Sequence, residues 1–244
     1  MKSISPNLNL MIKACEKASK ILIRDFGELE NLQVSRKGPK DFVTNSDIKV
    51  EKIIIKELSK KKFSIISEEI GTQIREDKNN FWVIDPIDGT TNFLHGVPHF
   101  CISIALINNN EIISGVIYDP IKNEIFYAEK NSGAFFNNHR IRVSKKNDLE
   151  KCLFGSNLYG TKNIDLNLRI SGSAALDMAY VASGRLDGFY QKKLNIWDIA
   201  AGSILISEAG GIVSPFDLKK IKNHTIIGAS EIIYKDLINI LKNF

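Results

Sequence analysis

The chain has 244 residues, of which 33 are Lys or Arg and 28 are Asp or Glu, so its formal net charge is +5. Hydrophobic residues make up 43% and charged residues 25%, close to the averages of folded proteins, which excludes a disordered or collagen-like chain. A chain of this length can bury a substantial core without disulfides or structural metals.

The cysteine pattern and the N-terminal segment indicate a cytoplasmic protein. The chain has three cysteines, which are Cys15, Cys101 and Cys152. They are far apart and follow no metal-ligand spacing, so we expect neither a disulfide framework nor a zinc site. Lysines at 13, 17 and 20 interrupt the first apolar stretch, which therefore resembles neither a signal peptide nor a membrane span. No membrane contact is expected, and the lysine run 60–62 is interpreted as a solvated helix end rather than a nucleic-acid patch.

Two helices are predicted at the start of the chain. Ser5 is a candidate N-cap with Pro6 at the first helical position, and apolar residues follow at helical spacing as far as Gly27. A second helix is predicted from Ser46 or Asp47 to about residue 58. The polar stretch 33–44 between them is expected to resemble a hairpin.

Short apolar runs joined by turn residues follow, and they predict a mostly antiparallel sheet. The predicted strands are 63–67, 81–87, 100–108, 111–120 and 124–130.

From about residue 150 the pattern changes to strands that alternate with helices, which is typical of α/β structure. The predicted strands are 152–156, 187–191, 210–216 and 225–230, and the predicted helices are 173–183, 198–209 and 231–241. No Gly/Ser/Pro-rich linker separates the two parts. We therefore expect one domain over 1–244, made of an α+β subdomain (1–145) and an α/β subdomain (146–244) that share an interface.

The segment FWVIDPIDGTTNF, residues 81–93, is the most informative part of the sequence. It places Asp85 and Asp88 at the end of a strand, and two carboxylates that close repel each other unless a hard cation such as Mg²⁺ neutralises them. Gly89 and Thr90 then begin a helical turn whose free N–H groups can receive a phosphate. The alternative is that Asp-Pro and Asp-Gly are only turn signals after a buried strand.

Two further acidic positions favour the metal hypothesis. Glu68 follows the strand 63–67, and Asp198 is predicted to N-cap the helix that follows Trp197. A solvated role for Glu68 and a purely capping role for Asp198 are the alternatives.

Several segments together resemble the magnesium-dependent, lithium-sensitive inositol monophosphatase family. They are DPIDGTTNF at 85–93, WDIAAGSILISEAGG at 197–211, DFVTNSD at 41–47, SEE at 67–69 and GSAALDMAYVASGRLDGF at 172–189. The sequences of these segments are most similar to the bacterial inositol-1-monophosphatase branch, the extragenic suppressor type. The resemblance implies a layered αβαβα sandwich of the sugar-phosphatase type, and a homodimer.

The resemblance also implies a set of metal ligands. Two to three Mg²⁺ ions would be held by Glu68, Asp85, the Ile87 carbonyl, Asp88 and Asp198. Asp85 would bridge two ions, and Glu68 would support a weakly bound third ion through water.

Catalytic and substrate contacts are implied in the same way. Thr90, hydrogen-bonded to Asp47, would orient the attacking water together with Glu68, and the Gly89 and Thr90 amides would receive phosphate oxygens. The other substrate contacts would be Asp88, Gly172, Ser173, Ala174 and Gln191. Gln191 stands where the family commonly has Glu, which puts the preference for inositol in question more than catalysis.

The predicted activity is Mg²⁺-dependent hydrolysis of inositol 1-phosphate, or of a related polyol or sugar phosphate, by a metal-activated water. No protein nucleophile is expected, because none of the four histidines lies in a phosphate-accepting motif. One alternative is a phosphatase for 3′-phosphoadenosine 5′-phosphate or fructose 1,6-bisphosphate, for which only Tyr159, Lys162 and Arg169 offer extra contacts. Another is a protein-binding role in transcription or ribosomal RNA maturation. The region 144–170 is shorter than is usual in the family, which could alter the rim of the site or the dimer.

Overall fold

The structure, a computed structural model, describes residues 4–29, 39–157 and 166–241, and of residues 39–44 it describes the backbone alone. Residues 33–38 of the predicted hairpin-like stretch therefore lie outside the part of the chain that the structure describes. Tyr159 and Lys162, the extra contacts considered for a nucleotide substrate, also lie outside them. Within the described part of the chain, no helix combines the length and the apolarity that crossing a membrane would need.

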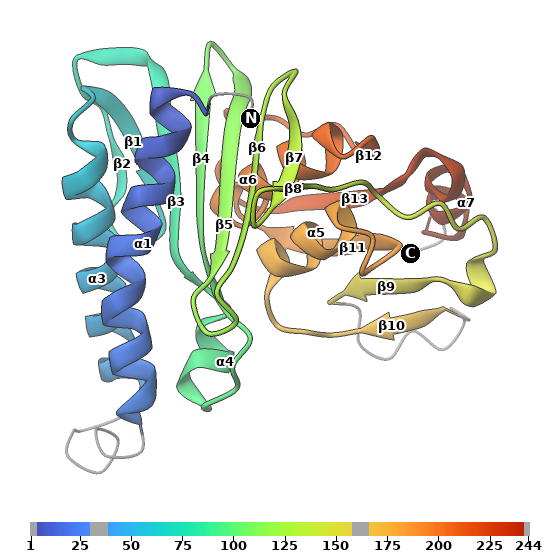
Figure 1. Cartoon of the computed structure of the whole chain (residues 1–244), viewed down its shortest axis with the longest axis horizontal. Helices are drawn as coiled ribbons and strands as arrows, with labels where there is room; N and C mark the ends of the chain where they lie inside the picture. The colour runs from blue at the N-terminus through green and yellow to red at the C-terminus, as the bar shows by residue number, and fades with distance from the viewer. Residues whose placement is uncertain (1–3, 30–38, 158–165, 242–244) are drawn as a thin grey trace.

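Five layers alternate helices with sheets (Figure 1). Helices α1 (Pro6–Gly27) and α3 (Pro39–Leu58) pack on the outer face of the first sheet. Helices α5 (Ala174–Ala182) and α6 (Ile196–Glu208) lie between the two sheets, and α7 (Glu231–Leu241) packs on the second. The predicted αβαβα sandwich is confirmed.

The first sheet is mostly antiparallel, as predicted. Its order among the described residues is β2-β1-β3-β4-β5-β6-β7-β8, and only β1 and β3 run parallel. Its strands are β1 (Phe63–Ser67), β2 (Gly71–Gln73), β3 (Asp77–Asp88), β4 (Cys101–Asn108), β5 (Glu111–Asp119), β6 (Glu124–Glu129), β7 (Gly133–Phe136) and β8 (His139–Arg140). The parallel pair brings the ends of β1 and β3 to the same edge, which places Glu68 near Asp85.

The second sheet has the order β10-β9-β11-β13-β12. β9 runs parallel to both of its neighbours, whereas β13 is antiparallel to β11 and β12. Its strands are β9 (Leu153–Ser156), β10 (Asn167–Arg169), β11 (Gly188–Leu194), β12 (Gly211–Val213) and β13 (His224–Ser230). Two short helices complete the described elements, α4 (Thr90–Leu94) and the 3-10 helix η1 (Leu149–Lys151).

Helix α1 begins as predicted, whereas α3 begins earlier than predicted. The Ser5 hydroxyl accepts a hydrogen bond from the backbone N–H of Leu8 at 3.2 Å, and Pro6 occupies the first turn, where its missing N–H costs nothing. Helix α3 starts at Pro39 and not at Ser46 or Asp47, so the second half of the predicted hairpin is helical. Pro39 has the φ that a first helical residue needs, and the polar residues after it masked the helical pattern.

Helix α6 is the central element, because it packs against strands of both sheets. It approaches β5 closely at Gly115, where a Cβ atom would lie 2.8 Å from the Cα of Ala201. The helix begins at Ile196 with Asn195 as its N-cap, so the prediction that Asp198 is the N-cap was wrong. Asp198 is instead the third helical residue, and its carboxylate accepts the Asn195 backbone N–H at 2.7 Å. A capping box of this kind allows the acidic residue to lie inside the first turn.

Candidate active site

Six elements end or begin around one cavity of about 280 Å³. The ends of β1, β3 and β11 meet the first turns of α4, α5 and α6 there. The cavity is lined by Glu68, Asp85, Ile87, Asp88, Gly89, Thr90, Gly172, Ala174, Gln191, Leu194, Asn195 and Asp198. All five predicted metal ligands are in this set. Of the other predicted residues, Asp47 and Ser173 do not line the cavity.

Three aspartates form the centre of the site. Ligand oxygens of Asp85, Asp88 and Asp198 all lie within 4.8 Å of one another. Oδ1 of Asp85 accepts the backbone N–H of Ile87 at 3.0 Å, and Oδ2 of Asp198 accepts that of Asn195. The backbone therefore fixes Asp85 and Asp198 through one oxygen each.

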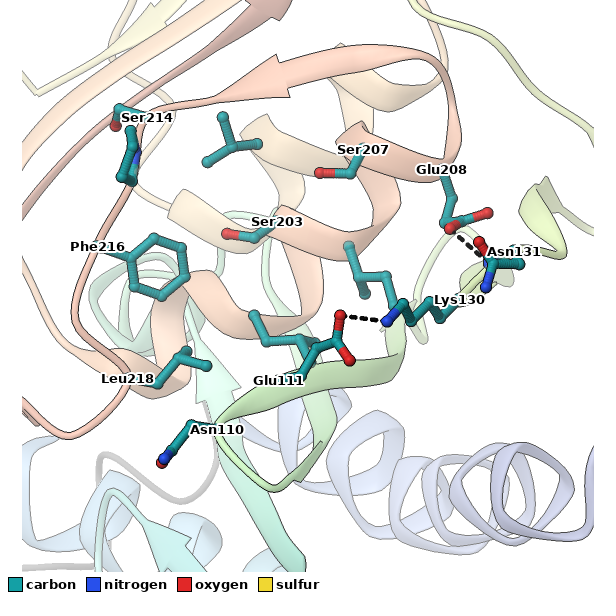
Figure 2. A pocket seen from close by; sticks show the side chains of 14 residues that line it. Asn110, Glu111, Lys130, Asn131, Ser203, Ser207, Glu208, Ser214, Phe216 and Leu218 are labelled. Carbon is teal, nitrogen blue, oxygen red and sulfur yellow. Dashed lines mark hydrogen bonds and ion pairs between the residues drawn. The ribbon is translucent and has the colours of Figure 1, made fainter.

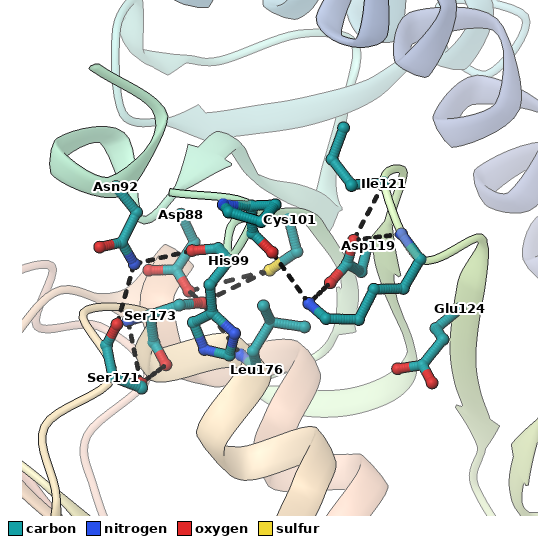
Figure 3. A network of polar contacts seen from close by, with 12 residues as sticks. Asp88, Asn92, His99, Cys101, Asp119, Ile121, Glu124, Ser171, Ser173 and Leu176 are labelled. Atoms are coloured by element: carbon teal, nitrogen blue, oxygen red, sulfur yellow. Dashed lines mark hydrogen bonds and ion pairs between the residues drawn. The ribbon is translucent and has the colours of Figure 1, made fainter. Parts of the chain in front are cut away.

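Asp88 is fixed most firmly, at the start of α5 (Figure 3). Its Oδ2 accepts the hydroxyl of Ser173 and the backbone N–H of Ala175, the latter at 2.8 Å, and the Cys101 thiol approaches it at 3.8 Å. The positive end of the helix dipole favours a carboxylate at this position. Ser173, predicted as a substrate contact, is buried behind Asp88 because its side chain both caps α5 and holds this carboxylate.

The charges of the cluster are not compensated by the protein. None of the ion pairs in the described part of the chain involves Glu68, Asp85, Asp88 or Asp198. Burial and the neighbouring carboxylates raise the pKa of Asp198 to about 8 and the pKa of Asp85 well above its usual value. Burial also raises the pKa of Asp88, and its bonds to Ser173 and α5 oppose that rise.

Glu68 lies at the solvent edge of this cluster. Partial desolvation raises the pKa of its carboxyl to about 7, a hydrogen bond with Asp85 opposes that rise, and the charges of Glu69 and Asp88 add to it. These carboxyl groups have raised pKa values and no cationic side chain beside them. A hard cation would neutralise such a group. The donors present, carboxylate oxygens with the Ile87 carbonyl beside them, are the oxygen ligands that Mg²⁺ prefers, so the residues fit that ion.

Glu51 holds the turn that carries Glu68, and sequence analysis missed this residue. Its Oε1 accepts the Ser67 hydroxyl and the backbone N–H groups of Glu69 and Ile70, the latter two at 3.3 and 3.4 Å. Glu51 is fully buried on α3. The only feature of the sequence that could have indicated this role is the position of Glu51 next to Val50, on the buried face of an amphipathic helix.

The predicted hydrogen bond between Thr90 and Asp47 is not formed. The Thr90 hydroxyl donates to the Ile87 carbonyl at 2.8 Å, because Gly89 in the left-handed region, with φ +94°, turns Thr90 back over the end of β3. Oδ1 of Asp47 is buried without a hydrogen-bond partner among the described residues. Burial, reinforced by the charges of Glu69 and Glu68, raises the pKa of Asp47 to about 8.

A second glycine turn lines the cavity just before α5. Gly172 has φ +87°, and a Cβ atom there would lie 2.8 Å from the Asn92 amide nitrogen. That nitrogen donates to the carbonyls of His99 and Ser171 at 2.7 and 2.9 Å, which ties α4 to the start of α5 (Figure 3). Gln191 lines the same cavity from β11.

Size alone does not identify the site, since a cavity of about 420 Å³ lies at the other end of α6 (Figure 2). Its charged side chains are already paired. Lys130 bonds to Glu111, and Glu208 accepts the backbone N–H groups of Asn131 and Gly133 at 2.8 and 2.7 Å. Among the described residues, its carboxylates form no cluster that could hold a metal ion, unlike Asp85, Asp88 and Asp198.

Comparison with known proteins places these observations in a family. The model of the inositol monophosphatase family matches residues 4–243. An inositol-1-monophosphatase from Mesorhizobium japonicum is 43% identical over 96% of this chain and 96% of its own length. The Nus factor SuhB of Escherichia coli is 41% identical over 86% of this chain and 85% of its own.

Solved structures agree with the sequence comparison. The crystal structure of the extragenic suppressor protein suhB from Bartonella henselae matches with a TM-score of 0.88 at 44% identity, over 98% of this chain and 99% of that chain. The Thermotoga maritima IMPase matches with a TM-score of 0.83 at 35% identity, over 98% of each chain.

The fold, the acidic cavity and these matches define the class of this protein, which is a metal-dependent phosphatase. More particularly, the chain belongs to the inositol monophosphatase family.

Proposed function

We propose that this chain hydrolyses the phosphate monoester of a polyol or sugar, with inositol 1-phosphate as the first candidate, to the alcohol and inorganic phosphate. The observation that carries the proposal is the group of Asp85, Asp88 and Asp198 within 4.8 Å, without a cationic side chain to balance it. A cavity of about 280 Å³ next to this group accommodates a phosphate and a small polyol.

The residues that would hold Mg²⁺ are those predicted from the sequence: Glu68, Asp85, the Ile87 carbonyl, Asp88 and Asp198. When bound, Mg²⁺ ions neutralise the phosphate oxygens, lower the pKa of water for attack on phosphorus and stabilise the leaving alkoxide. The chain supplies the frame for that chemistry. Backbone and hydroxyl donors fix one oxygen of Asp85, Asp88 and Asp198, so the free oxygens are preorganised.

The substrate is held by other groups in the same cavity. The Gly89 and Thr90 amides at the start of α4 are available to phosphate oxygens, since no side chain caps this helix. Gly172, Ala174 and Gln191 face the alcohol part. We propose that Asp47 accepts a hydrogen bond from the Thr90 hydroxyl when the Ile87 carbonyl binds a metal ion. The hydroxyl would then no longer donate to Ile87.

A panel of phosphate esters tests the proposal. Phosphate release would be measured from inositol 1-phosphate, 3′-phosphoadenosine 5′-phosphate and fructose 1,6-bisphosphate, with and without Mg²⁺. We expect Mg²⁺-dependent release, fastest from inositol 1-phosphate, with a loss of about a hundredfold or more in Asp88→Asn. Asp236→Asn, an exposed aspartate on α7, is the matched control and should keep full activity. Turnover of none of the esters by folded protein would contradict the proposal.

A second candidate is a binding role in transcription, because a relative that is 41% identical is named as a Nus factor. We propose to test it by a pull-down of RNA polymerase components with the Asp88→Asn protein, which separates binding from catalysis. Absence of any retained component would argue against this role. The homodimer, the inhibition by Li⁺ and the cytoplasmic location stay predictions from the sequence.

A further inference from the structure

Gln191 is held by a carboxylate that does not itself line the catalytic cavity. Its Nε2 donates to Oδ2 of Asp177 at 3.0 Å, from β11 to α5. Both side chains are buried, with 6% of Gln191 and 1% of Asp177 exposed. Gln191 lines the acidic cavity, whereas Asp177 lines a neighbouring one.

Asp177 is itself fixed on two further sides. The Ser171 hydroxyl donates to its Oδ1 at 2.7 Å, so both carboxylate oxygens act as acceptors. On β9, a Cβ atom at Gly155 would lie 2.8 Å from Cγ and Oδ2 of Asp177, so a glycine is needed there to leave room for the carboxylate. The position of Asp177 is therefore determined by the fold and not by Gln191 alone.

The contact decides which end of the amide a ligand meets. A glutamine amide has one acceptor and one nitrogen with two donors, and an ionised carboxylate accepts only. With Nε2 committed to Asp177, Oε1 is the end left for the cavity, and nothing among the described residues donates to it.

We propose that Asp177 is a positioning residue that turns the Gln191 amide so that its oxygen faces the substrate. The cavity then favours an ester whose alcohol part offers a hydroxyl hydrogen at this point, that is, a polyol or sugar phosphate. The inference rests on the proposed function and names a determinant of its substrate class.

Burial raises the pKa of the Asp177 carboxyl to about 7, so the test compares two esters at about pH 8, which favours the ionised form. Inositol 1-phosphate carries hydroxyls and phenyl phosphate carries none. In Asp177→Asn the asparagine can donate to Oε1, and the Gln191 amide can turn over. We expect KM for inositol 1-phosphate to rise about fivefold, the value of one hydrogen bond, with kcat changed less than about twofold. The kcat/KM for phenyl phosphate should stay unchanged.

Two further variants show whether Asp177 acts through Gln191. Gln191→Ala should raise KM for inositol 1-phosphate by a similar factor, and adding Asp177→Asn to it should change nothing more. In the double variant Asp177→Asn with Gln191→Glu, the asparagine amide donates to the glutamate carboxylate, so the direction of the hydrogen bond is reversed. The glutamate still presents an acceptor oxygen to the cavity, and KM for inositol 1-phosphate should return towards the wild-type value.

The outcomes separate this inference from the proposed function. If Asp177→Asn slows both esters equally, or if its effect adds to that of Gln191→Ala, Asp177 is merely structural and the inference is wrong. If Asp177→Asn does not fold, Ser171→Ala, which removes one bond to Asp177, is used instead. A rise in KM for inositol 1-phosphate alone would support the inference. An unchanged ratio of kcat/KM between the two esters would overturn it. Wild-type protein that cleaves neither ester would overturn the proposed function itself.

Discussion

At the residue scale, the aspartates of the cluster are ordinary side chains in an unusual electrostatic position. Each of the three gives one oxygen to a backbone or hydroxyl donor, which fixes the carboxylate without cancelling its charge. Burial, reinforced by the repulsion that remains between the carboxylates, raises the pKa of Glu68 to about 7 and that of Asp198 to about 8. Protons and the proposed Mg²⁺ would therefore compete for the same oxygens.

This competition predicts how Mg²⁺ stabilises the protein at different pH values. A carboxyl whose folded-state pKa is raised stabilises the fold below its unfolded pKa of about 4, and this contribution is lost as pH rises through about 7 to 8. Saturating Mg²⁺ should thus raise Tm little at about pH 5.5 and by about 5–10 °C at about pH 8. Scanning fluorimetry would measure this, with Asp198→Asn as the variant that weakens the effect. A Tm increase independent of pH would contradict it.

Most of the residues that line the cavity were predictable from the sequence, whereas their hydrogen-bond partners were not. Asp85 and Asp88 were predictable because a strand followed by Asp-Pro and Asp-Gly fixes where the strand ends. The bonds of Thr90 to Ile87 and of Ser173 to Asp88 were not, because they depend on side-chain rotamers and on how α5 meets β3. Glu51 was missed for the same reason, since its role exists only once the fold brings it next to Ser67 at the end of β1.

At the element scale, the site depends on turns held in place from outside the cavity. Gly89 allows the chain to pass from β3 to α4 with φ +94°, and a Cβ atom there would lie 3.0 Å from the His99 carbonyl oxygen. The turn after β1 is held by Glu51 from a neighbouring helix. Both turns carry groups of the proposed site, although neither Gly89 nor Glu51 is itself a predicted metal ligand.

Gly89→Ala should lose most of its activity and about 1–3 kcal/mol of stability, because the substitution adds both backbone strain and a steric clash. Gly210→Ala is the matched control, since Gly210 has φ +86° but nothing within 4 Å of a Cβ atom. The control should lose about 1 kcal/mol and keep its activity. Urea denaturation and phosphate release measure the two effects. Equal activity of the two variants would count against a role for the Gly89 turn.

Glu51→Ala should raise the Mg²⁺ concentration needed for half-maximal phosphate release about tenfold, because the turn that carries Glu68 loses its acceptor. Glu57→Ala, on the same helix, removes only contacts with the exposed Lys17 and Lys60 and should leave the Mg²⁺ requirement unchanged. A Mg²⁺ titration of both variants gives the comparison. An unchanged requirement in folded Glu51→Ala would show that Glu68 is held by other contacts.

At the scale of the whole molecule, the two sheets are joined by α6, which packs on strands of both. The layers were predictable, because hydrophobic periodicity distinguishes the helices from the strands and the resemblance supplied their order. The short strands β2, β8 and β10 were not, since two or three residues carry no periodicity of their own. The boundary near residue 145 separates two sheets, but the shared helix predicts one cooperative unit.

Truncation of a buried side chain on α6 should therefore destabilise the whole molecule at once. Leu205 is fully buried on this helix, and Leu205→Ala should cost about 2–5 kcal/mol of unfolding free energy. We expect a single calorimetric transition at a lower Tm, with equal calorimetric and van't Hoff enthalpies. Two separated transitions would show that the parts on either side of residue 145 unfold independently.

The central claim is that the acidic cluster would hold Mg²⁺, which would activate water for attack on the phosphorus of a polyol phosphate. The most direct measurement is a single turnover of inositol 1-phosphate in ¹⁸O-labelled water with Mg²⁺, followed by mass spectrometry of phosphate, inositol and protein. We predict one ¹⁸O atom in the phosphate, none in the inositol and a protein of unchanged mass, with no product when Mg²⁺ is removed. Label in the inositol, a protein heavier by one phosphoryl group, or turnover without any divalent cation would contradict the claim.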